Sequence, residues 1–209
     1  MQVKVCGMRE PENIQTLIRE VGPDLMGMIF YPKSSRYAGE KEGQEFSSFP
    51  VSKVGVFVNA SLEEVLGTVN DYGLSFVQLH GDEDLKFVKK LHQQSAVKII
   101  KVFRVEDQVN WKSLEPFEPY IEYFLFDTQT KMYGGSGRKF DWALLEQYPL
   151  KKQFLLSGGI DEDSASMIHA LANKVPQLVG VDINSKFEES PGLKDIGKIR
   201  RFVEALREN

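Results

Sequence analysis

The sequence predicts a closed (β/α)8 barrel, the TIM-barrel architecture, formed as a single domain by residues 1–209. Short apolar runs rich in β-branched and aromatic residues recur about every 25 residues, as in chains built of βα units. There are eight such runs, and the stretches between them are polar with helical spacing. Eight units favour closure over a doubly wound open sheet, which shows the same alternation with about five or six strands. No linker-like or low-complexity stretch divides the chain.

The eight runs are expected to form the barrel strands. Alternation along the first run puts Val3 and Val5 on one face and Lys4 and Cys6 on the other. We expect the valines to meet the helices, and Lys4 and Cys6 to point into the barrel. In order, the runs are Val3–Cys6, Leu25–Phe30, Lys53–Val58, Ser75–His80, Val97–Phe103, Glu122–Asp127, Gln153–Ser157 and Leu178–Asp182.

Apolar stripes at helical spacing predict the helices between the strands. The stripe in Pro11–Val21 begins with a proline that suits the first helical turn, and Gly22 suits its end. Ser61 followed by Glu64 predicts a capping box that opens a helix over Leu62–Tyr72. The remaining stripes consist of Leu85, Val88 and Leu91 after Asp82, and of Ile196, Ile199, Val203 and Leu206 near the end of the chain.

Composition is that of a soluble globular protein, with 42% hydrophobic and 27% charged residues. The net charge is −4 and the basic residues are scattered, which argues against nucleic-acid binding. A single cysteine fits a reducing compartment, and no apolar run approaches the roughly 18 residues of a membrane span. The first strand begins at residue 2, which leaves no room for a signal peptide, so we expect a cytoplasmic protein. No obvious apolar stripe is left exposed, so a monomer is expected rather than a homodimer.

Polar residues at strand ends are the candidates for chemistry, because active sites of this fold lie at the C-terminal ends of the strands. Cys6 is one of them, and a thiolate base is its functional interpretation, with the nearby Lys4 ammonium lowering the thiol pKa. The alternative is a small buried hydrophobe, as lone cysteines usually are. Asp127 ends another strand, where it is either a catalytic acid or a helix cap. The glycine-rich segment Gln129–Lys139 that follows is typical of a loop able to fold over a substrate.

Two further strand ends are suited to a phosphate group. Gly158-Gly159 allows backbone N–H groups to approach an anion, aided by the helix expected to begin near Asp161. Asp182, Asn184 and Ser185 would complete the cradle after the last strand.

The remaining candidates are less specific. Arg36 suits bidentate capture of a carboxylate, but a solvated surface arginine is the more common explanation. His80 is as consistent with a hydrogen-bonded structural role as with a catalytic one, and we place it among the residues that bind the substrate. The sequence has no metal-ligand spacing, no GxGxxG fingerprint and no P-loop.

Taken together, these motifs resemble the phosphoribosylanthranilate isomerase family, whose members catalyse an Amadori-type isomerisation in tryptophan biosynthesis. The resemblance covers essentially the whole chain and keeps the order of the motifs. The matching segments are Lys4–Met8, Ile29–Tyr37, Val54–Asn59, Val77–Gly81, Phe126–Thr128, Gly134–Gly137, Phe140–Trp142, Leu156–Ile160, Gly180–Asp182 and Pro191–Asp195.

The resemblance implies a cofactor-free barrel acting on a small phosphoribosyl substrate, N-(5-phosphoribosyl)anthranilate. By the same resemblance, Cys6 is the general base, Asp127 is the general acid and Arg36 holds the anthranilate carboxylate. The amides near Gly158-Gly159 and Asp182–Ser185 hold the phosphate. An acid that stays protonated near neutral pH requires an apolar pocket that raises the pKa of Asp127.

Two departures from the family pattern affect binding. Ser35 replaces a proline, which predicts a less rigid loop around Arg36. Asn184-Ser185-Lys186 replaces Ser-Ser-Gly, which alters the phosphate contacts and adds a positive charge.

Two other functions remain open from the sequence. The first is another phosphosugar barrel enzyme. An indole-glycerol-phosphate synthase would favour a lysine acid, for which Lys4 or Lys101 is available, whereas a pentose-phosphate epimerase would need paired carboxylates and usually a metal. The second is a catalytically silent barrel that binds a phosphoribosyl ligand and regulates a partner.

Overall fold

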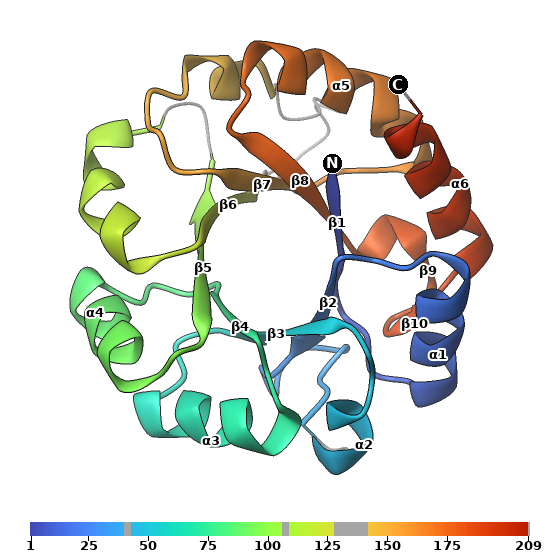
Figure 1. Cartoon of the computed structure of the whole chain (residues 1–209), viewed down its shortest axis with the longest axis horizontal. Coiled ribbons are helices and arrows are strands. Elements are labelled where there is room, and N and C mark those ends of the chain that lie inside the picture. The colour runs from blue at the N-terminus through green and yellow to red at the C-terminus, as the bar shows by residue number, and fades with distance from the viewer. Residues whose placement is uncertain (40–42, 106–108, 128–141, 209) are drawn as a thin grey trace.

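The computed structural model describes residues 1–39, 43–105, 109–127 and 142–208. Eight parallel strands close into a barrel in chain order, and β1 pairs with both β2 and β8 (Figure 1). The predicted (β/α)8 fold is therefore confirmed. The strands are β1 Gln2–Val5, β2 Leu25–Ile29, β3 Ser52–Phe57, β4 Phe76–Leu79, β5 Lys98–Arg104, β6 Tyr123–Asp127, β7 Phe154–Ser157 and β8 Leu178–Ile183.

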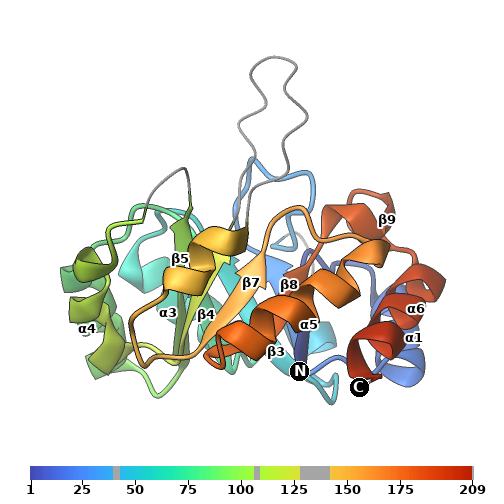
Figure 2. The same ribbon diagram turned by 90° about the horizontal axis from the view of Figure 1, so that it is seen from above.

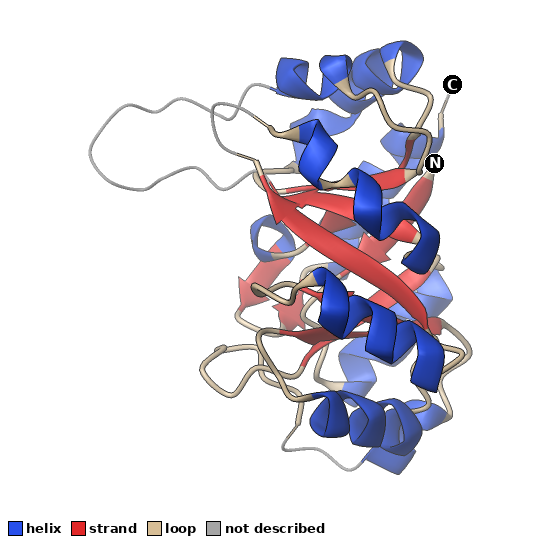
Figure 3. Ribbon diagram, turned by 90° about the vertical axis from the view of Figure 1, so that its left-hand side faces the viewer, coloured by secondary structure: helices blue, strands red, loops and turns tan. Residues whose placement is uncertain are grey.

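Helices surround the barrel, so that the strands form its inner layer (Figure 3). Their bounds are α1 Pro11–Glu20, α2 Gly43–Ser47, α3 Leu62–Tyr72, α4 Leu85–Gln94, α5 Ala165–Lys174 and α6 Ile196–Arg207. Short 3₁₀ turns complete the layer: η1 Trp111–Ser113, η2 Glu115–Tyr120, η3 Trp142–Gln147, η4 Glu162–Ser164 and η5 Ser185–Phe187.

The described segments on either side of β6 are 3₁₀ turns rather than α-helices. In η2, Pro116 stands in the first turn and Pro119 lies inside the element. Proline is tolerated in a first turn, but Pro119 lacks the N–H that the interior of an α-helix needs, which favours short turns here.

Helix starts follow the capping rules, with one shift from the expected position. The Ser61–Glu64 capping box is present: Glu64 N–H donates to Ser61 Oγ at 3.2 Å, and Ser61 N–H donates to Glu64 Oε2 at 2.7 Å. The fourth helix is capped by Asp84, whose Oδ1 accepts from Phe87 N–H at 2.8 Å. Asp82, which the sequence suggested as the start, instead donates its N–H to Asn59 Oδ1 at 2.7 Å.

Apolar side chains form two separate layers. The layer inside the barrel is made only of strand residues: Leu25, Val54, Phe76, Ile100, Val102, Tyr123, Leu125 and Leu155, with Val179 against them. Val3 and Val5 lie fully buried in the outer layer between strands and helices, as predicted. Lys4 is also fully buried, on the opposite face.

Both termini lie at the end of the barrel where the strands begin (Figure 2). The opposite end, where the strands finish, carries the βα loops and hence the expected site. No helix in the described residues is long and apolar enough to cross a membrane.

Candidate active site

A cavity of about 550 Å³ opens at the C-terminal ends of the strands. It brings together all but one of the residues that the sequence analysis selected as site candidates; the exception is Arg36. Those present are Cys6, His80, Asp127, Gly158, Gly159, Asp182, Asn184 and Ser185. A larger cleft of about 1020 Å³ lies between the segment after β2 and helix α3, but none of these residues lines it. The smaller cavity is therefore the candidate active site.

Cys6 follows β1 directly and is buried at the floor of the cavity. Its N–H donates to Ile183 O of β8 at 2.9 Å, so the residue continues the barrel ladder. Gly27 of β2 makes room for it, because a Cβ there would lie 2.8 Å from Cys6 Sγ and 2.9 Å from Lys4 Nζ. A side chain at Gly27 would thus displace the thiol and the ammonium.

The thiol is not activated in the way that the sequence suggested. Burial raises the pKa of Cys6, and the Lys4 ammonium only partly opposes that shift. Lys4 does lower this pKa, as expected, but the net shift is upward, because the loss of water around a buried thiolate outweighs one neighbouring charge.

Lys4 is committed to a buried ion pair across the seam between β1 and β8. Its Nζ lies 2.8 Å from Asp182 Oδ1, and the side chains are 0% and 5% exposed. Burial alone lowers the pKa of Lys4, but Asp182 and Cys6 outweigh it and raise that pKa. The ammonium therefore stays charged beside Cys6.

Asp127 and His80 form the opposite wall of the cavity. His80 Nε2 lies 3.3 Å from Asp127 Oδ2. Gln78 Nε2 lies 3.3 Å from His80 Nδ1, and this amide orientation assigns the ring proton to Nε2. His80 then donates to Asp127. Among the described residues, the surroundings of this carboxyl are thus partly polar rather than the apolar pocket expected from the sequence.

The two glycines after β7 adopt the backbone that the phosphate hypothesis requires. Gly158 and Gly159 have φ of 81° and 68°, in the left-handed region that favours glycine. A Cβ on Gly159 would meet nothing within 4 Å, so its backbone faces open space. Exposed Lys186 lines the same cavity after β8 and supplies a positive charge.

The start of the helix near Asp161 is less available to bind a phosphate than the sequence analysis expected. Asp161 forms a capping box with Ser164, whose backbone N–H and hydroxyl both donate to the Asp161 carboxylate. The hydroxyl lies 2.6 Å from Asp161 Oδ1. This carboxylate already satisfies the first turn and partly neutralises its positive end.

Arg36 lies beside the cavity and is held by a carboxylate of the protein. Its Nη2 lies 2.6 Å from Glu188 Oε2, and its backbone N–H donates to Ser34 Oγ at 3.1 Å. A second arginine, Arg9, donates to Ser35 O at 3.4 Å. These contacts hold the loop in which serine replaces the proline of the family pattern.

Three polar residues near the cavity were missed by the sequence analysis. Gln78 lines it with a buried Oε1 that has no partner within the described part of the chain. Its position two residues before His80, on the same strand face, was the available signal. Glu188 and Lys194 lie on a short hairpin after β8, β9 Glu188–Ser190 and β10 Leu193–Lys194, for which no local pattern was evident.

Neither of the two lysines proposed as the acid of a synthase-type reaction is available for that role, because other groups of the protein already bind both ammonium groups. Lys4 is held by Asp182, and Lys101 donates to Glu83 Oε2 at 2.9 Å and to Gly81 O at 2.8 Å. The glycine-rich segment 129–139 lies outside the described residues. Within residues 1–39, 43–105, 109–127 and 142–208, no group of three or more His, Cys, Asp or Glu side chains could hold a metal ion.

Comparison with known proteins agrees with this geometry over the full chain. The family model for N-(5'-phosphoribosyl)anthranilate (PRA) isomerase matches residues 3–205. The chain belongs to this family. It is accordingly an isomerase, and its place is in tryptophan biosynthesis.

Individual relatives resemble the chain along nearly their whole length. An N-(5'-phosphoribosyl)anthranilate isomerase of Phocaeicola vulgatus is 41% identical over 208 residues, which are 100% of this chain and 98% of the relative. That of Parabacteroides distasonis is 38% identical, covering 99% and 93%. The crystal structure of phosphoribosylanthranilate isomerase from Thermotoga maritima superposes with a TM-score of 0.80 at 32% identity, covering 99% and 98%.

A further solved relative carries a ligand. It is a phosphoribosylanthranilate isomerase in complex with reduced 1-(o-carboxyphenylamino)-1-deoxyribulose 5-phosphate. Its TM-score to this chain is 0.76 at 28% identity, and the match covers 99% of this chain and 98% of that one.

Proposed function

We propose that the barrel converts N-(5'-phosphoribosyl)anthranilate into 1-(2-carboxyphenylamino)-1-deoxyribulose 5-phosphate, with Cys6 as the general base and Asp127 as the general acid. The observation that carries this assignment is their position on one cavity, which also holds the two left-handed glycines after β7. An acid, a base and an anion site around one sugar are what an Amadori rearrangement needs.

In the first step, protonated Asp127 donates to the furanose ring oxygen. The bond from that oxygen to C1 breaks, and the nitrogen lone pair forms an iminium at C1. His80 Nε2 donates to Oδ2 and thereby leaves Oδ1 to carry the transferred proton.

In the second step, Cys6 removes the proton from C2, which the adjacent iminium has made acidic. The electron pair of that bond neutralises the iminium and gives an enolamine. The Cys6 thiol then returns a proton to C1 and the C2 hydroxyl gives its proton to the Asp127 carboxylate, which forms the ketone and restores both groups. The charged Lys4 beside Cys6 stabilises the thiolate from which this step starts.

Substrate binding is assigned to the remaining candidates. Arg36 holds the anthranilate carboxylate, and His80 and Asp182 contact the sugar. The backbone amides of Gly158, Gly159, Asn184 and Ser185 hold the phosphate, and Lys186 adds a positive charge.

Cys6→Ser and Asp127→Asn test the assignment. Each variant should lose about 10²–10⁴-fold in kcat, because each removes one positioned proton-transfer group. Affinity for the reduced product analogue should stay within about threefold, since the binding groups are intact. Turnover is followed by the fluorescence of the anthranilate substrate, with His92→Gln, on helix α4, as the control.

Wild-type kcat in either variant would remove that residue from the mechanism. Binding of the substrate by the native protein without turnover would instead support a silent regulatory barrel.

Quaternary structure and cellular location form a separate proposal. We keep a single-domain monomer as the proposed state, because Met1 and Met167 are the exposed large hydrophobics within the described residues. A solved relative from Thermotoga maritima, 30% identical, consists of monomers generated from a dimeric phosphoribosylanthranilate isomerase. Sedimentation at twice the chain mass would overturn the monomer. A cytoplasmic location is proposed because catalysis by Cys6 requires a reduced thiol.

A further inference from the structure

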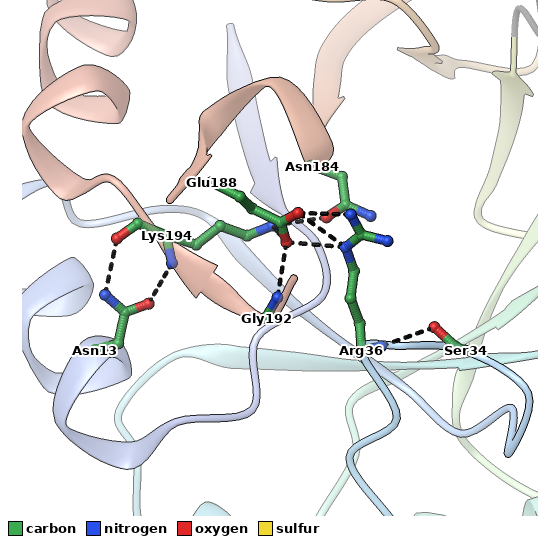
Figure 4. A network of polar contacts seen from close by, with 7 residues as sticks. All are labelled: Asn13, Ser34, Arg36, Asn184, Glu188, Gly192 and Lys194. Atoms are coloured by element: carbon green, nitrogen blue, oxygen red, sulfur yellow. Dashed lines mark hydrogen bonds and ion pairs between the residues drawn. The ribbon is translucent and has the colours of Figure 1, made fainter. Parts of the chain in front are cut away.

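Arg36 lies at the edge of the cavity, and its guanidinium group is already bound to the carboxylate of Glu188. Its Nε donates to both carboxylate oxygens of Glu188, at 2.9 and 3.0 Å, and its Nη2 lies 2.6 Å from Glu188 Oε2 (Figure 4). This uses the side edge of the guanidinium. The end edge, with the Nη1 hydrogens and one on Nη2, remains to bind a second carboxylate.

Glu188 is itself fixed by contacts other than Arg36. Its Oε1 accepts from Gly192 N–H at 3.1 Å and from Lys194 Nζ at 2.7 Å, and its side chain is only 4% exposed. Glu188 and Lys194 lie opposite each other on the paired strands of the β9–β10 hairpin. Glu188 is therefore anchored by contacts that do not depend on Arg36.

The same hairpin orients a second side chain. Lys194 Nζ, fully buried, donates to Asn184 Oδ1 at 2.6 Å (Figure 4). An ammonium only donates, so the amide oxygen must face it, and the NH₂ group of Asn184 is left to donate elsewhere. Asn184 lines the cavity, and that NH₂ is therefore available to a ligand.

Arg36 and Asn184 lie next to each other over the end of β1. A Cβ on Gly7 would come within 2.8 Å of both Arg36 Cδ and Asn184 Oδ1. Gly7 also has φ of +77°, which a side chain would strain. The glycine after Cys6 thus permits two donors to converge beside the catalytic thiol.

We propose that Glu188 is the positioning residue for Arg36, and that with Lys194 it aims the end edge of Arg36 and the Asn184 amide at the aromatic carboxylate of the substrate. The inference rests on the proposed function and assigns a role to a residue that does not touch the substrate. Two cations face one anion in this network, so positive charge remains for a bound carboxylate.

The test compares binding of two probes by Glu188→Gln. One probe is the reduced product analogue, and the other is the same molecule without the ring carboxylate. Glu188→Gln should weaken binding of the first by about 10–100-fold, because the donor edge is no longer held in place. Binding of the second should change less than about threefold.

Two further variants complete the design. Glu189→Gln removes the same charge from the next, exposed residue of β9 and should leave both affinities unchanged. In an Arg36→Ala background, Glu188→Gln should have no further effect on the preference for the carboxylated probe. If Glu188→Gln does not fold, Glu188→Asp keeps the charge, withdraws it by one methylene and should show the same selective loss.

Equal weakening of both probes would overturn the proposal, since it would mean that Glu188 only supports the fold. Unchanged binding would also overturn it. Tighter binding of the carboxylated probe would mean that Glu188 competes with the substrate for Arg36. Failure of the proposed function is seen separately, as absence of turnover in the unmodified protein.

Discussion

Cys6 shares the inner face of the barrel with a buried ammonium. The pair of Lys4 with Asp182 keeps that charge in place, while burial raises the pKa of the thiol. A base of this kind is scarce as thiolate near neutral pH but strongly basic once formed. Lys4 therefore acts in the proposed mechanism by limiting the upward pKa shift rather than by reversing it.

The protonation of Cys6 can be measured directly because the chain has one cysteine. Since its pKa is raised, the thiolate should appear only at a pH above that at which an exposed thiol ionises. Lys4→Met should move the transition further up, because it removes the charge that opposes burial. The thiolate ultraviolet absorbance, with the Cys6→Ser signal subtracted, follows both transitions. A transition below that of a free thiol would contradict the raised pKa.

At the residue scale, the sequence identified the candidate residues but not their partners or their burial. Cys6, Asp127 and Asp182 were selected because they end apolar runs, and that signal is local. The partner of Arg36 is 152 residues away, and no spacing rule connects them. Burial likewise decided the direction of the Cys6 pKa shift, and burial is a property of the folded chain.

At the scale of elements, the strand boundaries were predictable to within one residue. Period-two alternation and β-branched runs are imposed by the barrel itself, since each strand must face both the inner and the outer layer. The 3₁₀ segments on either side of β6 and the β9–β10 hairpin were not predicted. Their few residues carry too short a pattern to show a period.

The seam between β1 and β8 provides a prediction about stability. Asp182→Asn should lower the free energy of unfolding by about 3–5 kcal/mol, because it leaves the Lys4 ammonium buried without a counter-charge. Replacing both, as Lys4→Met with Asp182→Asn, should cost less than the single change. Urea unfolding gives these values.

An exposed pair is the matched control for the seam. Lys98 and Glu122 form an ion pair with side chains 54% and 37% exposed. Glu122→Gln should change the free energy of unfolding by less than about 1 kcal/mol. If Asp182→Asn lowers the free energy of unfolding by no more than Glu122→Gln does, the ion pair between Lys4 and Asp182 is not the buried contact described above.

At the scale of the whole molecule, the barrel turns distant strand ends into one site. Cys6 and Asp127 come from β1 and β6, and the proposed anion site comes from the loops after β7 and β8. The (β/α)8 fold dictates that these ends meet, which is why a correct fold prediction already located the cavity. The contacts between the side chains around the cavity depend on how the chain packs, so they could be described only from the structure.

The most direct test is a crystal structure of this protein with reduced 1-(2-carboxyphenylamino)-1-deoxyribulose 5-phosphate bound. The account predicts C2 of the sugar chain at about 3–3.5 Å from Cys6 Sγ, the contact distance of reacting atoms. Asp127 should lie on the other side of the chain, and the phosphate against Gly158 and Gly159. A ligand whose C2 lies away from Cys6, or whose phosphate binds elsewhere, would contradict it.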